Sequence, residues 1–179
     1  MVLSKMPTCF VIQPFDKGGP YDKRYRDVLV PAIGEAGLEP YRVDEDPGTT
    51  VLIDDIENGI RGAEVCLADI TTNNPNIWYE VGFAFANGKS VVLICLDPRP
   101  EPFPFDIRHR PVISYTLHSS SDFENLKREL VKRLRAQVEK AEKLQTVGGW
   151  PTLVRLNSIS RVPRPSFAWA GVFAGVWPR

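Results

Sequence analysis

The chain has 179 residues, of which 43% are hydrophobic and 25% are charged. This length allows one full hydrophobic core but not two domains of ordinary size, so we expect one globular domain with an appendage. Basic and acidic residues each total 22. Because affinity for a phosphate backbone depends on an excess of positive charge, this balance argues against a nucleic-acid partner.

No segment is typical of export or of membrane insertion. The stretch MVLSKMPTCFVIQPF lacks a basic segment followed by a long apolar run, and no run approaches the roughly 18 apolar residues of a membrane helix. Cys9, Cys66 and Cys95 lie inside apolar runs without paired spacing. We therefore expect a soluble cytoplasmic protein with reduced cysteines and no membrane partner.

Apolar runs alternate with helical patterns along the chain. The runs predict five strands, at 8–13, 39–43, 64–70, 90–96 and 111–116. Helical periodicity predicts helices at 21–36, 50–63, 75–88 and, in a charged amphipathic segment, 121–144. This alternation predicts an α/β fold with a doubly wound, mainly parallel sheet covered on both faces. The second strand is the most polar and is expected near an edge of the sheet.

The helix predicted at 75–88 has clear ends and one unusual residue. Asn74 is a suitable N-cap, Pro75 suits the first helical position, and the glycine of NGK at 87–89 suits the end. Helical periodicity places Glu80, its single acidic residue, beside the stripe that faces the core. A carboxylate in such surroundings needs an explanation.

Ligands of open parallel sheets bind outside the carboxyl ends of the strands. Polar and aromatic residues that follow these ends are predicted to share one rim with Glu80: Gln13, Phe15, Asp16, Asp69, Thr71, Asn74 and Asn76. A lone carboxylate among amides and aromatic rings suits cleavage of an N-glycosidic bond, whose transition state carries positive charge at the sugar carbon. Two alternatives remain open: Glu80 as a hydrogen-bonded residue of the helix surface, and Asp69 as a cap of the following turn.

Other candidate motifs carry less chemistry. His109 and His118 lack partners at metal-ligand spacing, so no metal site is expected. The segment DKGGP at 16–20 is not a nucleotide-binding fingerprint and is expected to form a lid beside the rim. Arg108 is a candidate phosphate ligand or, alternatively, a residue of a surface loop that pairs with acidic neighbours.

The composition changes after residue 144. The stretch 145–179 contains no Asp, Glu or Lys but holds Trp150, Trp169 and Trp177. We predict a domain at 1–144 and an aromatic extension at 145–179. The extension is either an arm for assembly or a poorly ordered appendage.

Several blocks between residues 8 and 116 carry a resemblance: CFVIQPF, YRDVLVPAIGEAGLEPYRVDE, IDDIENGIRGAEVCLADITTNNPNIWYEVGFAFANGKSVVLI and PFDIRHRPVISY. Together they resemble the bacterial TIR-like domains of the nucleoside 2-deoxyribosyltransferase-like superfamily. The resemblance implies a flavodoxin-like, five-stranded sheet and a catalytic glutamate at Glu80. It further implies cleavage of nucleosides, nucleotides or NAD, activity in an assembled homo-oligomer, and a role in bacterial antiphage defence. The acidic residue that deoxyribosyltransferases carry shortly before the glutamate is missing at 73–76, which argues against true deoxyribosyl transfer.

These observations yield one hypothesis with assigned residues. Glu80 acts as nucleophile or electrostatic stabiliser, and Asp69, Asn74 and Asn76 orient the sugar. Gln13, Phe15 and Tyr79 bound the base, and the remaining predicted substrate contacts are Asp16, Thr71 and Arg108. No cofactor is expected, because NAD or a nucleotide would be the substrate. The alternative is a non-catalytic module for nucleotide binding or self-assembly.

Overall fold

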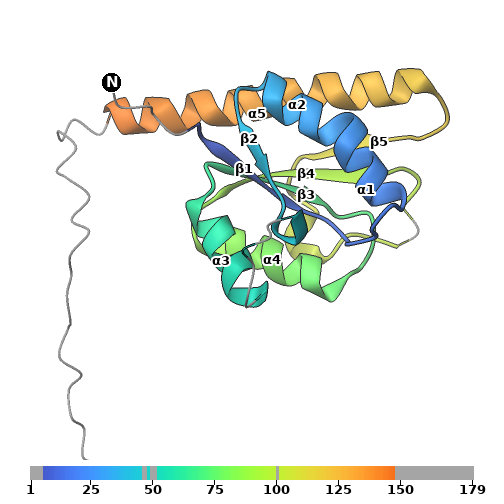
Figure 1. Ribbon diagram of the computed structural model, residues 1–179, viewed down its shortest axis with the longest axis horizontal. Coiled ribbons are helices and arrows are strands. Elements are labelled where there is room, and N and C mark those ends of the chain that lie inside the picture. The colour runs from blue at the N-terminus through green and yellow to red at the C-terminus, as the bar shows by residue number, and fades with distance from the viewer. Residues whose placement is uncertain (1–5, 46–47, 49–51, 100, 148–179) are drawn as a thin grey trace, which may run out of the picture. The chain divides into compact units, whose positions relative to one another are not determined.

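The computed structural model describes residues 6–45, 48, 52–99 and 101–147. These residues belong to one compact unit, Met1–Val147, in which helices cover both faces of a central sheet (Figure 1). The C-terminal helix runs three residues beyond the predicted boundary at 144. The rest of the extension predicted at 145–179 lies outside the described residues.

The sheet has five strands, and every neighbouring pair is parallel. The strands are β1 (Thr8–Ile12), β2 (Glu39–Tyr41), β3 (Val65–Asp69), β4 (Ser90–Leu96) and β5 (Val112–Tyr115). Their order in the sheet is β2-β1-β3-β4-β5, which confirms the flavodoxin-like prediction and places the polar β2 at an edge. The connections reverse direction between β1 and β3, where ligands of such sheets bind.

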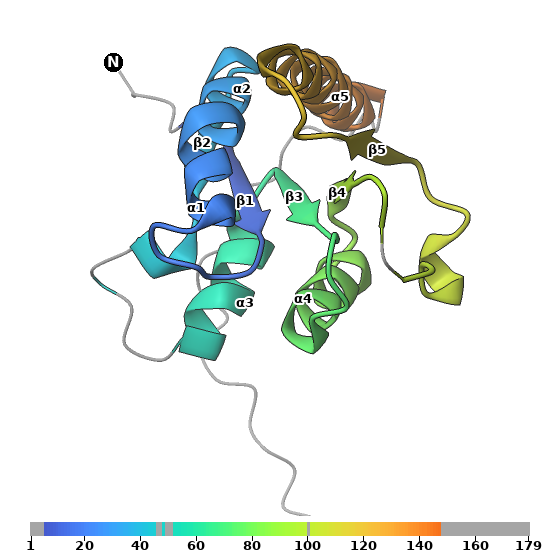
Figure 2. The same ribbon diagram turned by 90° about the vertical axis from the view of Figure 1, so that its right-hand side faces the viewer.

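Each face of the sheet has its own helical layer (Figure 2). One layer contains α1 (Pro20–Arg24), the π-helix η1 (Tyr25–Leu29), α2 (Val30–Glu35) and α5 (Ser120–Val147). The other contains α3 (Leu52–Gly62) and α4 (Pro75–Ala86). Two short 3₁₀ helices, η2 (Val43–Glu45) and η3 (Phe105–Ile107), complete the described elements.

The helix predicted at 21–36 is one helical run with a π-helical centre. The Val30 N–H bonds to the carbonyl of Tyr25, five residues back. Pro31 follows directly and lacks the N–H that an α-helical bond to the carbonyl of Asp27 requires. We attribute the wider turn to this proline.

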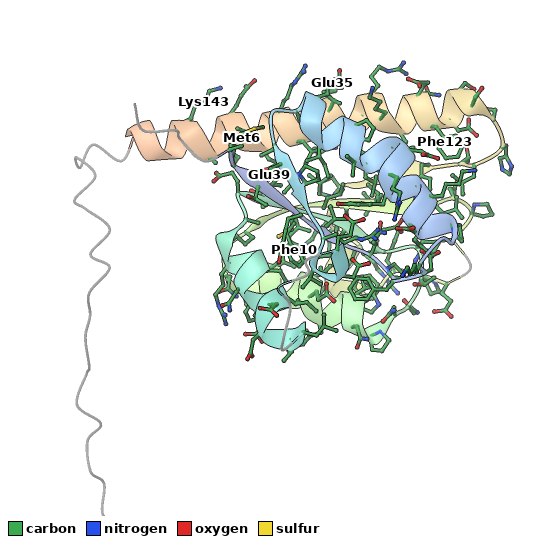
Figure 3. All side chains as sticks on the ribbon, viewed as in Figure 1. Met6, Phe10, Glu35, Glu39, Phe123 and Lys143 are labelled. Carbon is green, nitrogen blue, oxygen red and sulfur yellow. The ribbon has the colours of Figure 1, made fainter. Side chains whose placement is uncertain are left out.

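Successive side chains along each strand point to opposite faces of the sheet and pack into two separate hydrophobic cores. Val11 and Leu67 pack beneath α2 and α5, whereas Phe10 and Ala68 pack against α3 and α4. Phe10 is labelled in Figure 3 among the side chains that fill the interior. Full burial of one such large apolar side chain contributes roughly 1.5–3 kcal/mol, so both helical layers are held firmly to the sheet.

The three cysteines are unpaired and buried, as predicted. Over the part of the chain that the structure describes, no helix is long and apolar enough to cross a membrane.

Candidate active site

A cleft opens beyond the carboxyl ends of β1 and β3, on the sheet face covered by α3 and α4. Its volume is about 490 Å³, within the range of small-molecule sites. Eleven residues line it: Gln13, Pro14, Phe15, Leu52, Ile53, Ile56, Asn74, Asn76, Ile77, Tyr79 and Glu80. Six of the ten predicted site residues are thus brought together, the exceptions being Asp16, Asp69, Thr71 and Arg108.

Glu80 reaches the cleft because the start of α4 is fixed by its cap. The Asn74 side chain accepts a hydrogen bond from the Asn76 N–H at 2.9 Å, and Pro75 opens the helix. Glu80 lies about one and a half turns further on, beside the buried Ile77 and Val81. The helix therefore presents a carboxylate from its buried side.

The Glu80 carboxylate is isolated from polar partners. The residue is only 8% exposed, and among the described residues its carboxylate has no hydrogen bond or ion pair. Burial raises its pKa to about 7, since the charged form loses hydration without compensation. The alternative of a hydrogen-bonded surface residue is therefore wrong. Both protonation states of Glu80 are populated near neutral pH.

Gln13 follows β1 and is 3% exposed. Its Nε2 donates to the Tyr21 carbonyl oxygen at 3.4 Å. Its Oε1 is buried and has no hydrogen-bond partner among the described residues. Buried acceptors are rarely left unpaired in proteins.

Large apolar side chains surround the cleft mouth. Phe15, Leu52, Ile53 and Tyr79 are each 46–50% exposed. The Tyr79 hydroxyl donates to Glu57 Oε1 at 2.5 Å, which ties α4 to α3. Sequence reasoning missed Leu52 and Ile53, although their signal, an apolar pair ahead of the core position Ile56, was present in the chain.

Asp16 and Arg108 form contacts away from the cleft. The two carboxylate oxygens of Asp16 accept from the N–H groups of Tyr21 and Asp22, at 2.9 and 2.8 Å, and so hold the start of α1. The segment predicted as a lid is a turn in which the Gly19 N–H bonds to the Asp16 carbonyl oxygen. Arg108 Nε donates to the Phe103 carbonyl oxygen at 3.1 Å.

Asp69 lies at the predicted rim, but its side chain is on the other face of the sheet from α4. Side chains alternate along a strand, and Asp69 shares its side with Leu67 of the opposite core. Its Oδ2 accepts from Arg24 Nη2 at 2.6 Å and from the Tyr115 hydroxyl at 2.8 Å. The expectation that Asp69 lies beside Glu80 is corrected accordingly.

The second oxygen of Asp69 organises the loop that leads to α4. Oδ1 accepts from the Thr71 N–H at 3.0 Å and from the Thr71 hydroxyl at 2.6 Å. The Thr71 hydroxyl in turn accepts from the Leu96 N–H at 2.9 Å. The alternative of a turn cap is therefore confirmed for Asp69, and Thr71 is a structural partner of it.

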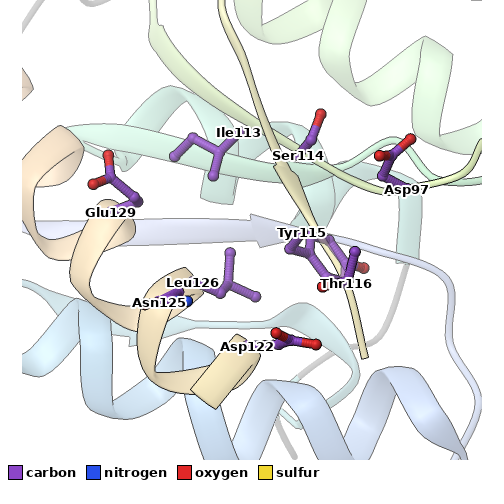
Figure 4. A pocket seen from close by; sticks show the side chains of 9 residues that line it. All are labelled: Asp97, Ile113, Ser114, Tyr115, Thr116, Asp122, Asn125, Leu126 and Glu129. Atoms are coloured by element: carbon purple, nitrogen blue, oxygen red, sulfur yellow. The ribbon is translucent and has the colours of Figure 1, made fainter. Parts of the chain in front are cut away.

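A smaller cavity of about 200 Å³ lies between β5 and the start of α5 (Figure 4). Three of its lining residues are acidic: Asp97, Asp122 and Glu129. Asp122 caps α5 by accepting from the N–H groups of His118 and Ser119. None of the predicted site residues lines this cavity. Across the described ranges, no group of three or more His, Cys, Asp or Glu residues is arranged to hold a metal ion.

No protein-family model and no curated protein matches the sequence. Among solved structures, the TIR domain of the Toll-related receptor TRR-2 from Hydra magnipapillata has a TM-score of 0.50 and 15% identity, covering 71% of this chain and 97% of that one. The CMP N-glycosidase BcmB from Clostridium botulinum has a TM-score of 0.50 and 16% identity, covering 68% and 98%. These likenesses support a TIR-like or nucleoside-glycosidase-like fold.

Proposed function

We propose that this protein cleaves the N-glycosidic bond of a nucleoside, a nucleotide or NAD. One observation carries the proposal: the wall of a ligand-sized cleft holds a buried carboxylate, Glu80, that has no hydrogen-bond or ion-pair partner among the described residues. A folded protein bears the cost of such burial most readily where function requires it. The presence of an N-glycosidase among proteins of similar fold supports this reaction class.

The chemistry follows from the charge that develops during cleavage. As the bond from the sugar carbon to the base breaks, positive charge spreads over that carbon and the ring oxygen. The ionised Glu80 carboxylate stabilises this charge or attacks the carbon to form a glycosyl-enzyme. Its effect is strengthened because the carboxylate is largely buried, where the effective dielectric is lower than in bulk water.

The other cleft residues have complementary roles in this proposal. The Asn74 Oδ1 is engaged in the helix cap, which leaves its Nδ2 hydrogens for a sugar hydroxyl. Asn76 lies one turn before Glu80 on the same side of α4 and offers a second amide. Phe15 and Tyr79 present aromatic rings at the mouth, where a base has a face to stack against.

Asp69 takes a positioning role instead of a catalytic one. Its hydrogen bonds to Thr71 fix the start of the loop that carries Asn74. Because Asn74 caps the first turn of α4, the contacts of Asp69 with Thr71 help to fix the position of Glu80 in the cleft.

A second candidate is a binding module without catalysis. Glu80 is the only carboxyl group that lines the cleft among the described residues. No second acid is therefore placed there to protonate a departing base. A cleft of this kind suits a ligand sensor as well as an enzyme.

The deciding experiment separates the two candidates. Wild type, Glu80→Gln and a control, Glu139→Gln on the exposed side of α5, are incubated with NAD, nucleosides and nucleotides at low and high protein concentration. Release of base or nicotinamide by wild type and control, but not by Glu80→Gln, supports the enzyme. Steeper-than-linear dependence on concentration supports activity in an assembled homo-oligomer, which the resemblance to TIR-like domains implies together with a role in antiphage defence. Saturable binding without product supports the sensor. If the protein neither releases product nor binds any of these compounds, both candidates are overturned.

A further inference from the structure

We propose that Gln13 is a specificity-determining residue of the cleft: its Oε1 accepts a hydrogen bond from an N–H or O–H donor of the bound nucleoside. The inference rests on the proposed function and deepens it. It starts from a neutral side-chain oxygen of a cleft residue that is fully buried and lacks a partner among the described residues.

The orientation of the Gln13 amide is set by its surroundings. Its Nε2 donates to the Tyr21 carbonyl oxygen. Rotating the amide by half a turn would bring Oε1 against that carbonyl oxygen, which also has no hydrogen to offer. Gln13 therefore presents an acceptor, and not a donor, on its remaining side.

A fixed and buried acceptor discriminates more strongly than an exposed one. A ligand with a donor at the right position satisfies Oε1, whereas a ligand without the donor leaves it unpaired and dry. Two donors of a nucleoside have the required chemistry: an exocyclic amine of the base and a hydroxyl of the sugar. The Asn74 Oδ1 differs from the Gln13 Oε1, because it already accepts a hydrogen bond from the Asn76 N–H.

Matched substrates identify the donor. Adenosine is compared with purine riboside, which lacks the amine, and with 2′-deoxyadenosine, which lacks one hydroxyl. The values of kcat/KM are measured for wild type, for Gln13→Met, which keeps the length but removes the acceptor, and for Gln137→Met on α5 as control. In wild type and control, we expect loss of the donor that Gln13 binds to lower kcat/KM by roughly tenfold or more.

In Gln13→Met, the preference for adenosine over the analogue that lacks the donor bound by Gln13 should fall to about twofold or less. The preference for adenosine over the other analogue should persist. The proposal is overturned if Gln13→Met retains both preferences or lowers kcat/KM equally for all three substrates. Absence of turnover in every protein, wild type included, would instead count against the proposed function. The binding constants of the same three compounds then provide the comparison for Gln13.

The charge of the cleft carries a second inference independently: the geometry points to an uncharged nucleoside as the preferred ligand over its phosphorylated form. Among the described residues that line the cleft there is no Lys, Arg or His, and Glu80 is the one ionisable acid. Lys17 is the basic residue nearest in sequence to a cleft residue, Phe15, but its side chain is exposed and does not line the cleft. A 5′-phosphate would therefore lack a cation and face a negative carboxylate.

The test compares a nucleoside with its own 5′-monophosphate at pH 8 and low ionic strength. We expect kcat/KM to be higher for the nucleoside by roughly tenfold, from the repulsion of like charges at a separation of several ångströms. Added salt should narrow the difference because it screens that repulsion. Equal or faster cleavage of the monophosphate overturns the inference while leaving the proposed reaction in place, and cleavage of neither substrate counts against the reaction itself.

Discussion

Arg24 and Asp69 form a buried ion pair, with 2.6 Å between Nη2 and Oδ2, that joins α1 to the end of β3. The Arg24 guanidinium also lies over the rings of Tyr21 and Tyr115, at 4.7 and 5.0 Å. The pair lies on the sheet face opposite the helix that carries Glu80. Through the bonds of Asp69 to Thr71, the loop that leads to α4 is anchored from this opposite face.

Replacing Asp69 by Asn should lower stability much more than it changes the chemistry. The variant leaves the Arg24 charge buried without its counter-ion, which costs about 3–5 kcal/mol of the free energy of unfolding. Chemical denaturation measures this loss. Turnover per folded molecule should fall by less than roughly tenfold, since only the loop to α4 is loosened, and the pH profile should not move. Intact stability with abolished turnover would place Asp69 in catalysis after all.

Turnover should depend on the ionisation of Glu80. Burial raises its pKa to about 7, and the proposed chemistry requires the carboxylate. We therefore expect kcat/KM to rise with pH through about 7 and to level off above it. A pH–rate profile of the free enzyme reports this pKa directly. A profile that is flat from pH 5 to 9 would contradict the role of Glu80.

The same group should make the protein less stable as pH rises. The folded-state pKa of Glu80, about 7, lies above its ordinary value of 4.5. The folded protein therefore binds more protons between these two values, and the free energy of unfolding contributed by Glu80 decreases across that window. A pKa shift of this size lowers the free energy of unfolding at pH 8 by an amount on the order of 3 kcal/mol.

Glu80→Gln tests this linkage because glutamine cannot ionise. The variant should match wild type near pH 4.5 and exceed its unfolding free energy at pH 8, with Glu139→Gln as the unchanged control. Loss of activity together with a gain in stability would show that the buried charge is kept at the expense of the fold. Equal stability of variant and wild type at pH 8 would mean that Glu80 is better solvated than its burial indicates.

Local signals predicted most of the fold and about half of the site. The predicted strand at 90–96 coincides with β4, and the cap signals at Asn74 and Pro75 placed α4 and hence Glu80. To predict on which face of the sheet Asp69 lies, the alternation of side chains along β3 is needed, because adjacent residues of this strand pack into opposite cores. Its pairing with Arg24 joins residues 45 positions apart, and no local pattern indicates such a contact.

The apolar mouth should contribute to binding more than to stability. Leu52 and Ile53 are about half exposed, so replacing each by Asn should change the free energy of unfolding by less than about 0.5 kcal/mol. If their side chains contact the ligand, KM should rise by roughly three- to tenfold per residue. Leu117→Asn, an exposed leucine outside the cleft, is the control. Unchanged KM in both variants would exclude Leu52 and Ile53 from substrate binding.

Gly59 on α3 should be the least tolerant glycine of the cleft's supporting helix. An added Cβ would overlap Phe10 Cε2 and come within 2.9 Å of Tyr41 Cε1. Phe10 of β1 is buried between the sheet and α3, so Gly59→Ala must push α3 outward, at about 1–3 kcal/mol of unfolding free energy. Gly62→Ala is the matched control, because a Cβ at this position meets open space. The variant should gain up to about 1 kcal/mol of unfolding free energy from the higher helix propensity of alanine.

The Gly59 substitution also connects packing with the site. Since α3 carries Leu52, Ile53 and Ile56 into the cleft, its displacement should raise KM in Gly59→Ala but not in Gly62→Ala. Denaturation curves and Michaelis–Menten kinetics on the two variants measure both effects. If Gly59→Ala were as stable as wild type with the same KM, the close contact of α3 with Phe10 would not be what positions this side of the cleft.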